Sequence, residues 1–195
     1  MVGGPNPSAA TNFNIGDFRM KKIFILFLLL IAGAPAMAAD SYVGIHLVRS
    51  AYTVKFADSS KQTWRANWVG LMFGRVLSDG FGFELQLGSV QLGLNSNWAT
   101  NYNLMVNGKF AYKIAGFLSP YAGAGIGPSY WETDEGKWNF SYQGFTGISF
   151  DLMDSVDADI RVTIRNLGRI PDNHIFQTTG SVIETAGRIG VLWKY

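Results

Sequence analysis

The chain has no cysteine and little charge. Its 195 residues include no Cys and only two His, and charged residues make up 15% of the total. Ordinary soluble domains contain about 25% charged residues. Without cysteine, neither a disulfide framework nor a thiolate metal site can form. The length provides material for one domain.

The small excess of basic residues is confined to the N-terminal stretch. The formal net charge of the whole chain is +2. Residues 1–38 hold three of the 16 basic residues and one of the 14 acidic residues, which leaves 13 of each kind in the remainder. A nucleic-acid-binding domain needs a basic face, so we expect no nucleic-acid partner.

No apolar run is long enough to cross a membrane as a helix. The run Ile23–Ile31 has about nine residues, whereas a transmembrane helix needs about 20. It follows the positive segment Met20–Lys22 and precedes a small-x-small sequence, Ala36–Ala38. This arrangement is typical of a secretory signal peptide. We predict an over-extended, unstructured start over 1–19, a signal peptide over 20–38 and a mature domain over 39–195.

The terminal stretch Arg188–Tyr195 has the period of a β-strand. Ile189, Val191, Trp193 and Tyr195 fall on one face, and Arg188, Gly190 and Lys194 fall on the other. Such alternation predicts a strand with one apolar and one polar side. Trp and Tyr prefer the boundary between a membrane and water, so the pattern favours a strand of a membrane β-barrel.

Seven further runs are amphipathic or rich in strand-forming residues. Together the pattern predicts eight strands, at about Tyr42–Ser50, Trp64–Val76, Phe81–Ser89, Asn101–Lys113, Ser119–Trp131, Trp138–Leu152, Asp157–Arg165 and Val182–Tyr195. The period slips near Val69, which predicts a bulge there. Gly123, Gly125 and Gly127 are interpreted as making room in a narrow lumen, because no helix follows them to complete a dinucleotide-binding loop.

The predicted connections alternate between longer and shorter. They fall at residues 51–63, 77–80, 90–99, 114–118, 132–137, 153–156 and 169–181. Outer-membrane barrels have short turns at one end and longer loops at the other. A soluble sandwich or barrel has no physical reason to separate loop lengths by side, although a secreted soluble β-protein is the alternative fold.

The chain resembles small eight-stranded outer-membrane proteins of the OmpA-like type, which contain an outer membrane protein beta-barrel domain. The resemblance rests on Ser41–Gly44, on Pro120–Gly125 and on the terminal strand. There, Arg188, Gly190, Trp193 and Tyr195 resemble the signal recognised by the barrel assembly machinery. It implies an all-β, eight-stranded antiparallel up-and-down transmembrane β-barrel in the cell outer membrane. The implied partners are outer-membrane lipid and lipopolysaccharide, the assembly machinery, and a host or surface ligand bound through extracellular loops.

The charged residues of the predicted strands share faces opposite β-branched residues. An Arg facing lipid at mid-depth would cost roughly 2–4 kcal/mol, so we expect these faces to point inward. The predicted lumen network has a structural role and comprises Glu84, Lys109, Asp157, Asp159, Arg161, Arg165, Glu184 and Arg188, with Gln86 beside it. Antiparallel pairing of the last two strands predicts that Arg165 lies near Glu184, Asp157 near Lys194 and Arg161 near Arg188. The last pair needs an anion, for which Asp159 and Glu84 are the candidates.

The sequence predicts no catalytic, cofactor-binding or metal-binding residue. The Asp172-x-His174 sequence falls in the last long connection and is interpreted as solvated loop. The His-x-Ser pair that outer-membrane lipid A deacylases use does not occur. We therefore expect a non-catalytic role in envelope integrity, surface adhesion or partner binding through loops. The alternatives are a lipid-modifying outer-membrane enzyme and a narrow channel.

Overall fold

The computed structural model describes residues 41–55, 60–78, 80–94, 97–114, 116–133, 136–170 and 181–195. The predicted start extension, the signal peptide and the Asp172–His174 pair lie outside these residues. The described part of the chain contains no helix with the length and apolarity needed to span a membrane.

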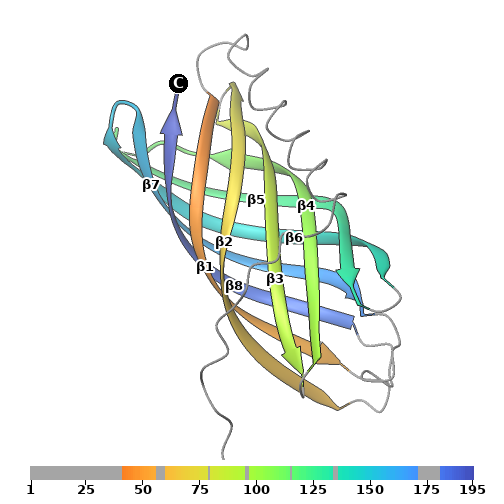
Figure 1. Cartoon of the computed structure of the whole chain (residues 1–195). Coiled ribbons are helices and arrows are strands. Elements are labelled where there is room, and N and C mark those ends of the chain that lie inside the picture. The colour runs from red at the N-terminus through yellow and green to blue at the C-terminus, as the bar shows by residue number, and fades with distance from the viewer. Residues whose placement is uncertain are drawn as a thin grey trace, which may run out of the picture. The chain divides into compact units, whose positions relative to one another are not determined.

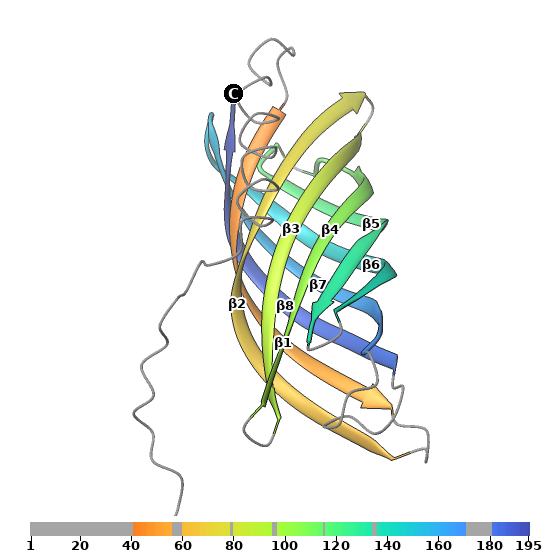
Figure 2. The same cartoon turned by 45° about the vertical axis from the view of Figure 1, so that its right-hand side comes forward.

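Eight antiparallel strands close into a barrel, which confirms the predicted fold. Each strand pairs with the next along the chain, and β8 pairs with β1 to close the ring (Figures 1 and 2). The strands are β1 Ser41–Lys55, β2 Lys61–Ser78, β3 Phe81–Leu94, β4 Asn97–Ala111, β5 Leu118–Glu132, β6 Lys137–Met153, β7 Val156–Arg169 and β8 Ser181–Lys194.

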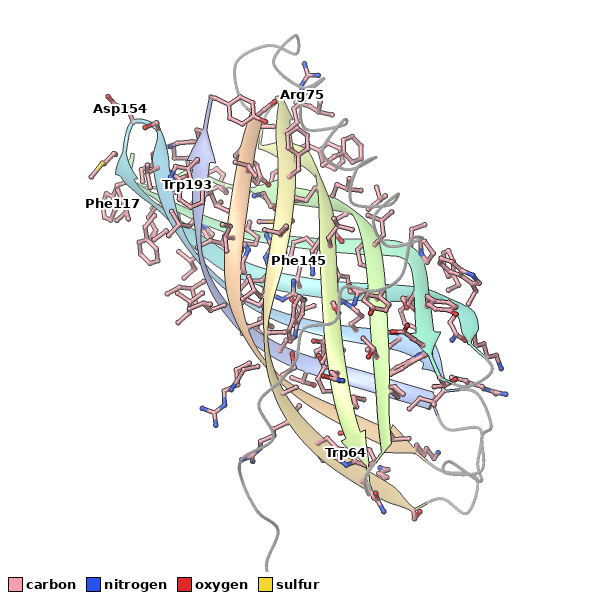
Figure 3. All side chains as sticks on the ribbon, in the orientation of Figure 1. Trp64, Arg75, Phe117, Phe145, Asp154 and Trp193 are labelled. Atoms are coloured by element: carbon pink, nitrogen blue, oxygen red, sulfur yellow. The ribbon has the colours of Figure 1, made fainter. Side chains whose placement is uncertain are left out.

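The barrel has two distinct ends. At one end, called the turn end here, lie the β2–β3, β4–β5 and β6–β7 connections together with both ends of the barrel chain, where the Tyr195 amide donates to the Ser41 carbonyl at 3.0 Å. This end is uppermost in Figure 1, and Asp154 marks it in Figure 3. The opposite end, called the loop end, has the other four connections and lies near Trp64 in Figure 3.

The middle of the outer surface is an apolar belt. Strand residues that point outward here are large and hydrophobic and stay exposed, such as Leu47 at 69% and Ile164 at 59%. The same belt includes Ile45, Val69, Val106, Phe110, Ile126, Ile160, Val162 and Ile189. Soluble monomers rarely expose so large a continuous apolar surface. A belt that runs around every strand is the surface that a lipid bilayer covers.

Towards the loop end, the polarity of the two faces is reversed on β1, β2 and β3. On β1 the outward residues become Arg49, Thr53 and Lys55, while the inward Val48 and Tyr52 are buried. These two join an apolar cluster inside the barrel that also contains Val54, Trp68, Val90, Leu92, Ala99, Trp131, Leu167, Ile170, Val182 and Ala186. On these three strands the loop-end part has an apolar interior and a polar exterior, as a water-soluble β-barrel does, whereas β6 has the exposed Trp138 and Phe140 on its outer face.

This reversal explains why the predicted loops are too long. The connections predicted at 51–63 and 90–99 are wrong in extent, because β1 continues to Lys55, β2 starts at Lys61, and only residues 95–96 separate β3 from β4. Long and short connections therefore do not segregate cleanly by end, since the β4–β5 connection at the turn end spans residues 112–117. In the sequence, the strands are marked by outward apolar residues, and these residues stop at the edge of the belt. The strands themselves continue beyond it.

The bulge predicted near Val69 is wrong. The β1–β2 ladder runs through Val69 without interruption, and β2 shifts register between Val76 and Ser78 instead. Near Val69 the inward side chains Trp68 and Met72 are also apolar and buried. With apolar residues on both faces, the alternation disappears from the sequence although the strand is regular.

The loop-end half of the β2–β3 contact is closed by a side chain. The ladder between these strands ends at the pair Leu71 and Leu87, and within the described residues positions 61–70 of β2 pair with β1 alone. The Trp68 ring covers Gly88 of β3 so closely that a Cβ there would collide with it. Packing of this indole therefore replaces backbone bonds at that place.

Inward glycines face inward rings across the strands. Tyr42 lies opposite Gly74, Tyr121 opposite Gly147, and Phe145, labelled in Figure 3, opposite Gly123. A Cβ at any of the three glycines would overlap the facing ring. The narrow lumen thus accepts an aromatic ring where the neighbouring strand has no side chain.

We predict that Gly147→Ala destabilises the barrel by about 1–3 kcal/mol, as overpacking of a filled interior does, because the new methyl group would displace Tyr121. The control is Gly144→Ala on the same strand, where a Cβ meets nothing within 4 Å. Urea unfolding in detergent micelles, followed by tryptophan fluorescence, measures both. Equal midpoints for the two variants would contradict this description of the lumen.

Candidate functional site

The lumen is divided into three zones along the barrel axis. At the turn end, a cavity of about 910 Å³ opens to the outside and reaches Tyr42, Lys109 and Tyr121. A zone of buried charged and amide side chains follows. The apolar cluster fills the loop end. The charged zone is the candidate site, because it combines buried ionisable groups with a path from one mouth.

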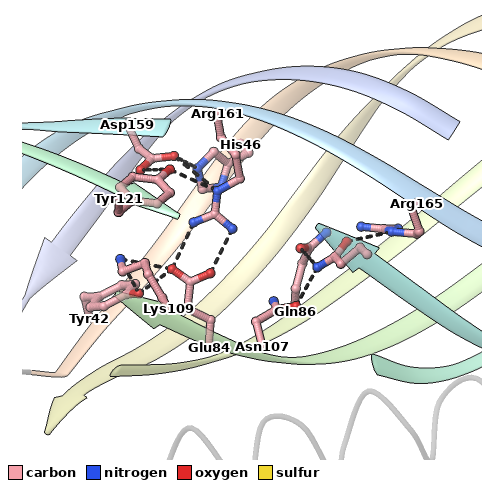
Figure 4. Close-up of polar contacts among 11 residues, drawn as sticks. Tyr42, His46, Glu84, Gln86, Asn107, Lys109, Tyr121, Asp159, Arg161 and Arg165 are labelled. Carbon is pink, nitrogen blue, oxygen red and sulfur yellow. Dashed lines mark hydrogen bonds and ion pairs between the residues drawn. The ribbon is translucent and has the colours of Figure 1, made fainter. Parts of the chain in front are cut away.

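Glu84 on β3 is the centre of the first cluster in this zone (Figure 4). Arg161 on β7 donates two parallel hydrogen bonds to its carboxylate, at 2.8 and 2.9 Å. The Tyr42 hydroxyl donates to it at 2.6 Å, and the Lys109 ammonium lies 3.1 Å away. Glu84 is 1% exposed. Its charge is therefore balanced by direct contacts across the lumen, which a buried carboxylate requires.

Asp159 forms a second cluster, which Arg161 connects to the first. The Tyr121 hydroxyl donates to Asp159 at 2.6 Å and accepts from the Arg161 Nε at 3.0 Å. His46 Nε2 lies 2.8 Å from the other oxygen of Asp159. The Arg161 guanidinium also lies over the Phe145 ring, 4.4 Å from its centroid. Figure 4 shows Arg161 between the two carboxylates.

Arg165 and Glu184 form a third cluster nearer the loop end. Arg165 donates to Gln143 at 2.8 Å and to Asn103 at 2.7 Å, and its Nη1 is 3.5 Å from the Glu184 carboxylate. Ser50 and Tyr52 donate to that carboxylate at 2.6 and 2.8 Å. Amide, hydroxyl and guanidinium groups thus hold this ion pair where the lumen becomes apolar.

The structure brings together most of the predicted lumen residues. The register places Arg165 opposite Glu184 and Arg161 opposite Arg188, as predicted. Asp157 lies at the turn-end mouth, where its carboxylate is 2.7 Å from the Lys194 ammonium. Arg188 is buried beside these clusters, but no ion pair or hydrogen bond to another described residue satisfies its Nε and Nη2.

Sequence reasoning missed other polar members of the network. Tyr42, His46, Tyr121 and Gln143 all contact its charged residues. All of them occupy inward positions of their strands, so the alternation alone could have identified them. They were missed because an aromatic or amide residue on an inward face does not by its own chemistry indicate an ion-binding role.

One ion pair at the turn end lies outside the lumen zone. Lys113 donates to Asp151 at 2.7 Å, and this hydrogen bond raises the pKa of the Lys113 ammonium. Both side chains have access to solvent, so the pair should contribute little to stability. It offers a comparison for the buried pairs.

A family comparison agrees with this geometry. Residues 24–184 match the model of the outer membrane protein beta-barrel domain. The chain belongs to this family. No curated protein matches it in sequence, so its relatives are recognised by structure.

Several solved outer-membrane barrels share the fold at low sequence identity. Neisserial surface protein A of Neisseria is 14% identical with a TM-score of 0.65, over 80% of this chain and 97% of that one. The attachment invasion locus protein Ail of Yersinia pestis, solved with the heparin analogue sucrose octasulfate, is 14% identical with a TM-score of 0.50, over 82% and 100%. The outer membrane protein OprG of Pseudomonas aeruginosa is 13% identical with a TM-score of 0.51, over 80% and 96%.

The buried His46 and Asp159 pair resembles two members of a hydrolytic triad. The hydrogen bonds among the described residues connect this pair to Tyr121 and Arg161, and none of them connects His46 to a serine. Among the described residues, the pair belongs to the polar network around Arg161. The described residues also contain no group of three His, Asp or Glu side chains placed to hold a metal ion.

We predict that the wild-type barrel does not conduct steadily in planar bilayers, because an eight-stranded lumen is about filled by its side chains. Glu84→Gln leaves Arg161 and Lys109 without their carboxylate. The change should cost about 3–5 kcal/mol of stability, as breaking a buried ion pair does, and should produce a measurable leak.

The matched control is Asp151→Asn, which removes a carboxylate from the exposed Lys113 pair and should change stability by less than about 1 kcal/mol. Large, steady openings of the wild-type protein would show that the charged zone does not block the lumen.

Proposed function

We propose that this protein is a non-catalytic outer-membrane anchor that presents its loop end as a binding surface to a ligand outside the membrane. The observation that supports this most directly is the reversal of polarity along the strands. A transmembrane strand needs about 9–11 residues, whereas these strands have 14–18. On β1, β2 and β3 the additional residues have a polar exterior.

The polar segment would hold the loops at a fixed distance above the membrane. On β1, Leu47 is the last large apolar residue that points outward, and Lys55 follows eight residues later. At about 3.3 Å per residue this corresponds to about 26 Å of strand, and less along the barrel axis because the strands tilt. The apolar cluster inside this segment makes it rigid, which suits a platform for binding.

The exposed face of this platform on β1 and β2 is basic. Lys55 pairs with Lys61, and Arg65 lies four residues further along β2, opposite Ala51. Arg49 points outward at the edge of the apolar belt. Among the described outward residues of the loop-end halves of β8, β1, β2 and β3, none is acidic. Four cations on one face favour a ligand with several negative charges.

The relatives are consistent with this class of ligand. Ail of Yersinia pestis, which shares the fold, was solved with sucrose octasulfate, a heparin analogue. We propose that the basic face of the present barrel binds polyanionic surface material of similar chemistry, such as sulfated or phosphorylated saccharides. Envelope integrity through contacts with lipopolysaccharide would use the same face at the height of Arg49.

The test is binding of sucrose octasulfate to the barrel in nanodiscs, measured by calorimetry. We expect the double variant Lys61→Glu with Arg65→Glu to bind at least tenfold more weakly and to show a smaller dependence on salt. The control changes the same amount of charge on the other side of the loop end, through Lys137→Glu with Arg169→Glu, both exposed. Equal losses in the two double variants would argue against a site on β1 and β2.

We further propose that Gly190, Trp193 and Tyr195 form the signal read by the barrel assembly machinery. Trp193 and Tyr195 are half exposed at the turn end, where β8 stops. Replacing both by Ala should lower the amount of heat-modifiable barrel in the outer membrane several-fold.

Trp138→Ala with Tyr142→Ala provides the control, since these are an exposed Trp and an exposed Tyr on β6. Gel mobility of boiled and unboiled outer-membrane samples measures both double variants. A normal level of the Trp193 and Tyr195 variant would refute the assignment.

A further inference from the structure

The charges inside the lumen do not balance. Between the turn-end cavity and the apolar cluster, the described buried side chains provide three carboxylates, Glu84, Asp159 and Glu184. They also provide four cations, Lys109, Arg161, Arg165 and Arg188. At the mouth, Asp157 and Lys194 compensate each other. The zone therefore contains at least one positive charge in excess.

The excess is localised on Arg188. Glu84 and Asp159 together balance Arg161 and Lys109, and Glu184 lies beside Arg165. Arg188 is 3% exposed, and its Nε and Nη2 have no hydrogen-bond partner among the described residues. A buried guanidinium with unsatisfied N–H groups is costly unless something accepts its hydrogen bonds.

Arg188 is fixed in this position. Its guanidinium lies over the Trp68 ring, 5.3 Å from the centroid. The indole N–H of Trp68 donates to Ser50 at 3.0 Å, and the ring packs on Gly88. The face of the guanidinium is thus occupied by an aromatic ring, while N–H groups at its edge remain available to a ligand.

Other unsatisfied donors lie at neighbouring inward positions. The Thr163 hydroxyl and the Arg165 Nη2 also have no hydrogen-bond partner among the described residues, and one acceptor nearby, the Glu184 Oε2, has only the Arg165 Nη1 at 3.5 Å. Thr163 is the inward residue between Arg161 and Arg165 on β7, and it faces Ala186, which lies between Glu184 and Arg188 on β8. The side chain opposite Thr163 is therefore only the methyl group of Ala186.

We propose that a single monovalent inorganic anion of chloride size binds in the lumen between Arg188, Arg165 and Thr163. One negative charge offsets the excess of the charged zone. A divalent anion would overcompensate it, and an organic anion would not fit among the packed side chains. The Tyr42, Lys109 and Tyr121 layer separates this position from the turn-end cavity, so the ion is enclosed when the barrel closes and exchanges slowly afterwards.

The first test uses the wild-type barrel crystallised with bromide in place of chloride. An anomalous peak within hydrogen-bond distance of Arg188 is the expected result. A water molecule at that position, with bromide found only on exposed arginines or nowhere, would overturn the proposal. This experiment needs no variant and does not depend on how a substitution folds.

The second test measures urea unfolding in detergent micelles at constant ionic strength, with chloride exchanged for gluconate. A ligand that binds only the folded state at tenfold excess over its Kd lowers the unfolding constant about tenfold. We expect this chloride effect in the wild type and in Arg49→Gln, which removes an exposed arginine. It should be lost in Arg188→Gln and weakened in Thr163→Val, which retains every charge.

The direction of the stability difference between Arg188→Gln and the wild type in gluconate is a further test. Without chloride the wild type holds an uncompensated buried cation, so Arg188→Gln should be at least as stable as the wild type in that solution. The same chloride dependence in the wild type and in Arg188→Gln would contradict the site. If Arg188→Gln does not fold, Thr163→Val and the bromide experiment decide the question.

Discussion

The structure depends on one constraint, which is that backbone N–H and C=O groups in a bilayer must be paired within the protein. Eight strands meet it by closing β8 onto β1. Closure fixes which residues point inward and which point outward along every strand. The apolar belt, the charged zone and the facing glycines and rings all follow from this alternation. The same constraint is relaxed towards the loop end, where the ladder between β2 and β3 stops and Trp68 closes the gap.

In a narrow lumen, charged side chains that point inward from opposite walls come into direct contact. Glu84 comes from β3 and Arg161 from β7, which are far apart in sequence, yet their side chains meet across the interior at 2.8 Å. In a wider barrel each charge would be solvated separately. Here the contacts between opposite walls satisfy most of the network, and Arg188 stands out because its edge groups have no such partner. The network therefore has two roles, to fill the interior and to define where an additional ion fits.

The reversal of polarity divides the barrel into a membrane part and a part exposed to water. In the membrane part, lipid covers the apolar outer residues and the polar network fills the lumen. In the exposed part, Val48, Tyr52 and Trp131 form an interior core while Arg49, Arg65 and Lys61 face outward. On β1, β2 and β3 the apolar residues of this second part are buried by one another. It supports the proposal that the loop end is the binding surface.

The sequence alone determined the strand count, the alternation of faces, the inward direction of the charged residues and the register of β7 and β8, because each depends on local period and on antiparallel pairing. Arg165 opposite Glu184 is the clearest example. Strand ends at the loop end, the position of the bulge and the partners of Tyr42, His46 and Tyr121 were decided only in three dimensions. The strand ends could not be predicted because the faces exchange polarity beyond the membrane. A single pattern of apolar outward residues therefore cannot describe a whole strand. The partners of these three residues could not be predicted because contacts across a closed lumen depend on the stagger of all eight strands. No single segment of the sequence encodes that stagger.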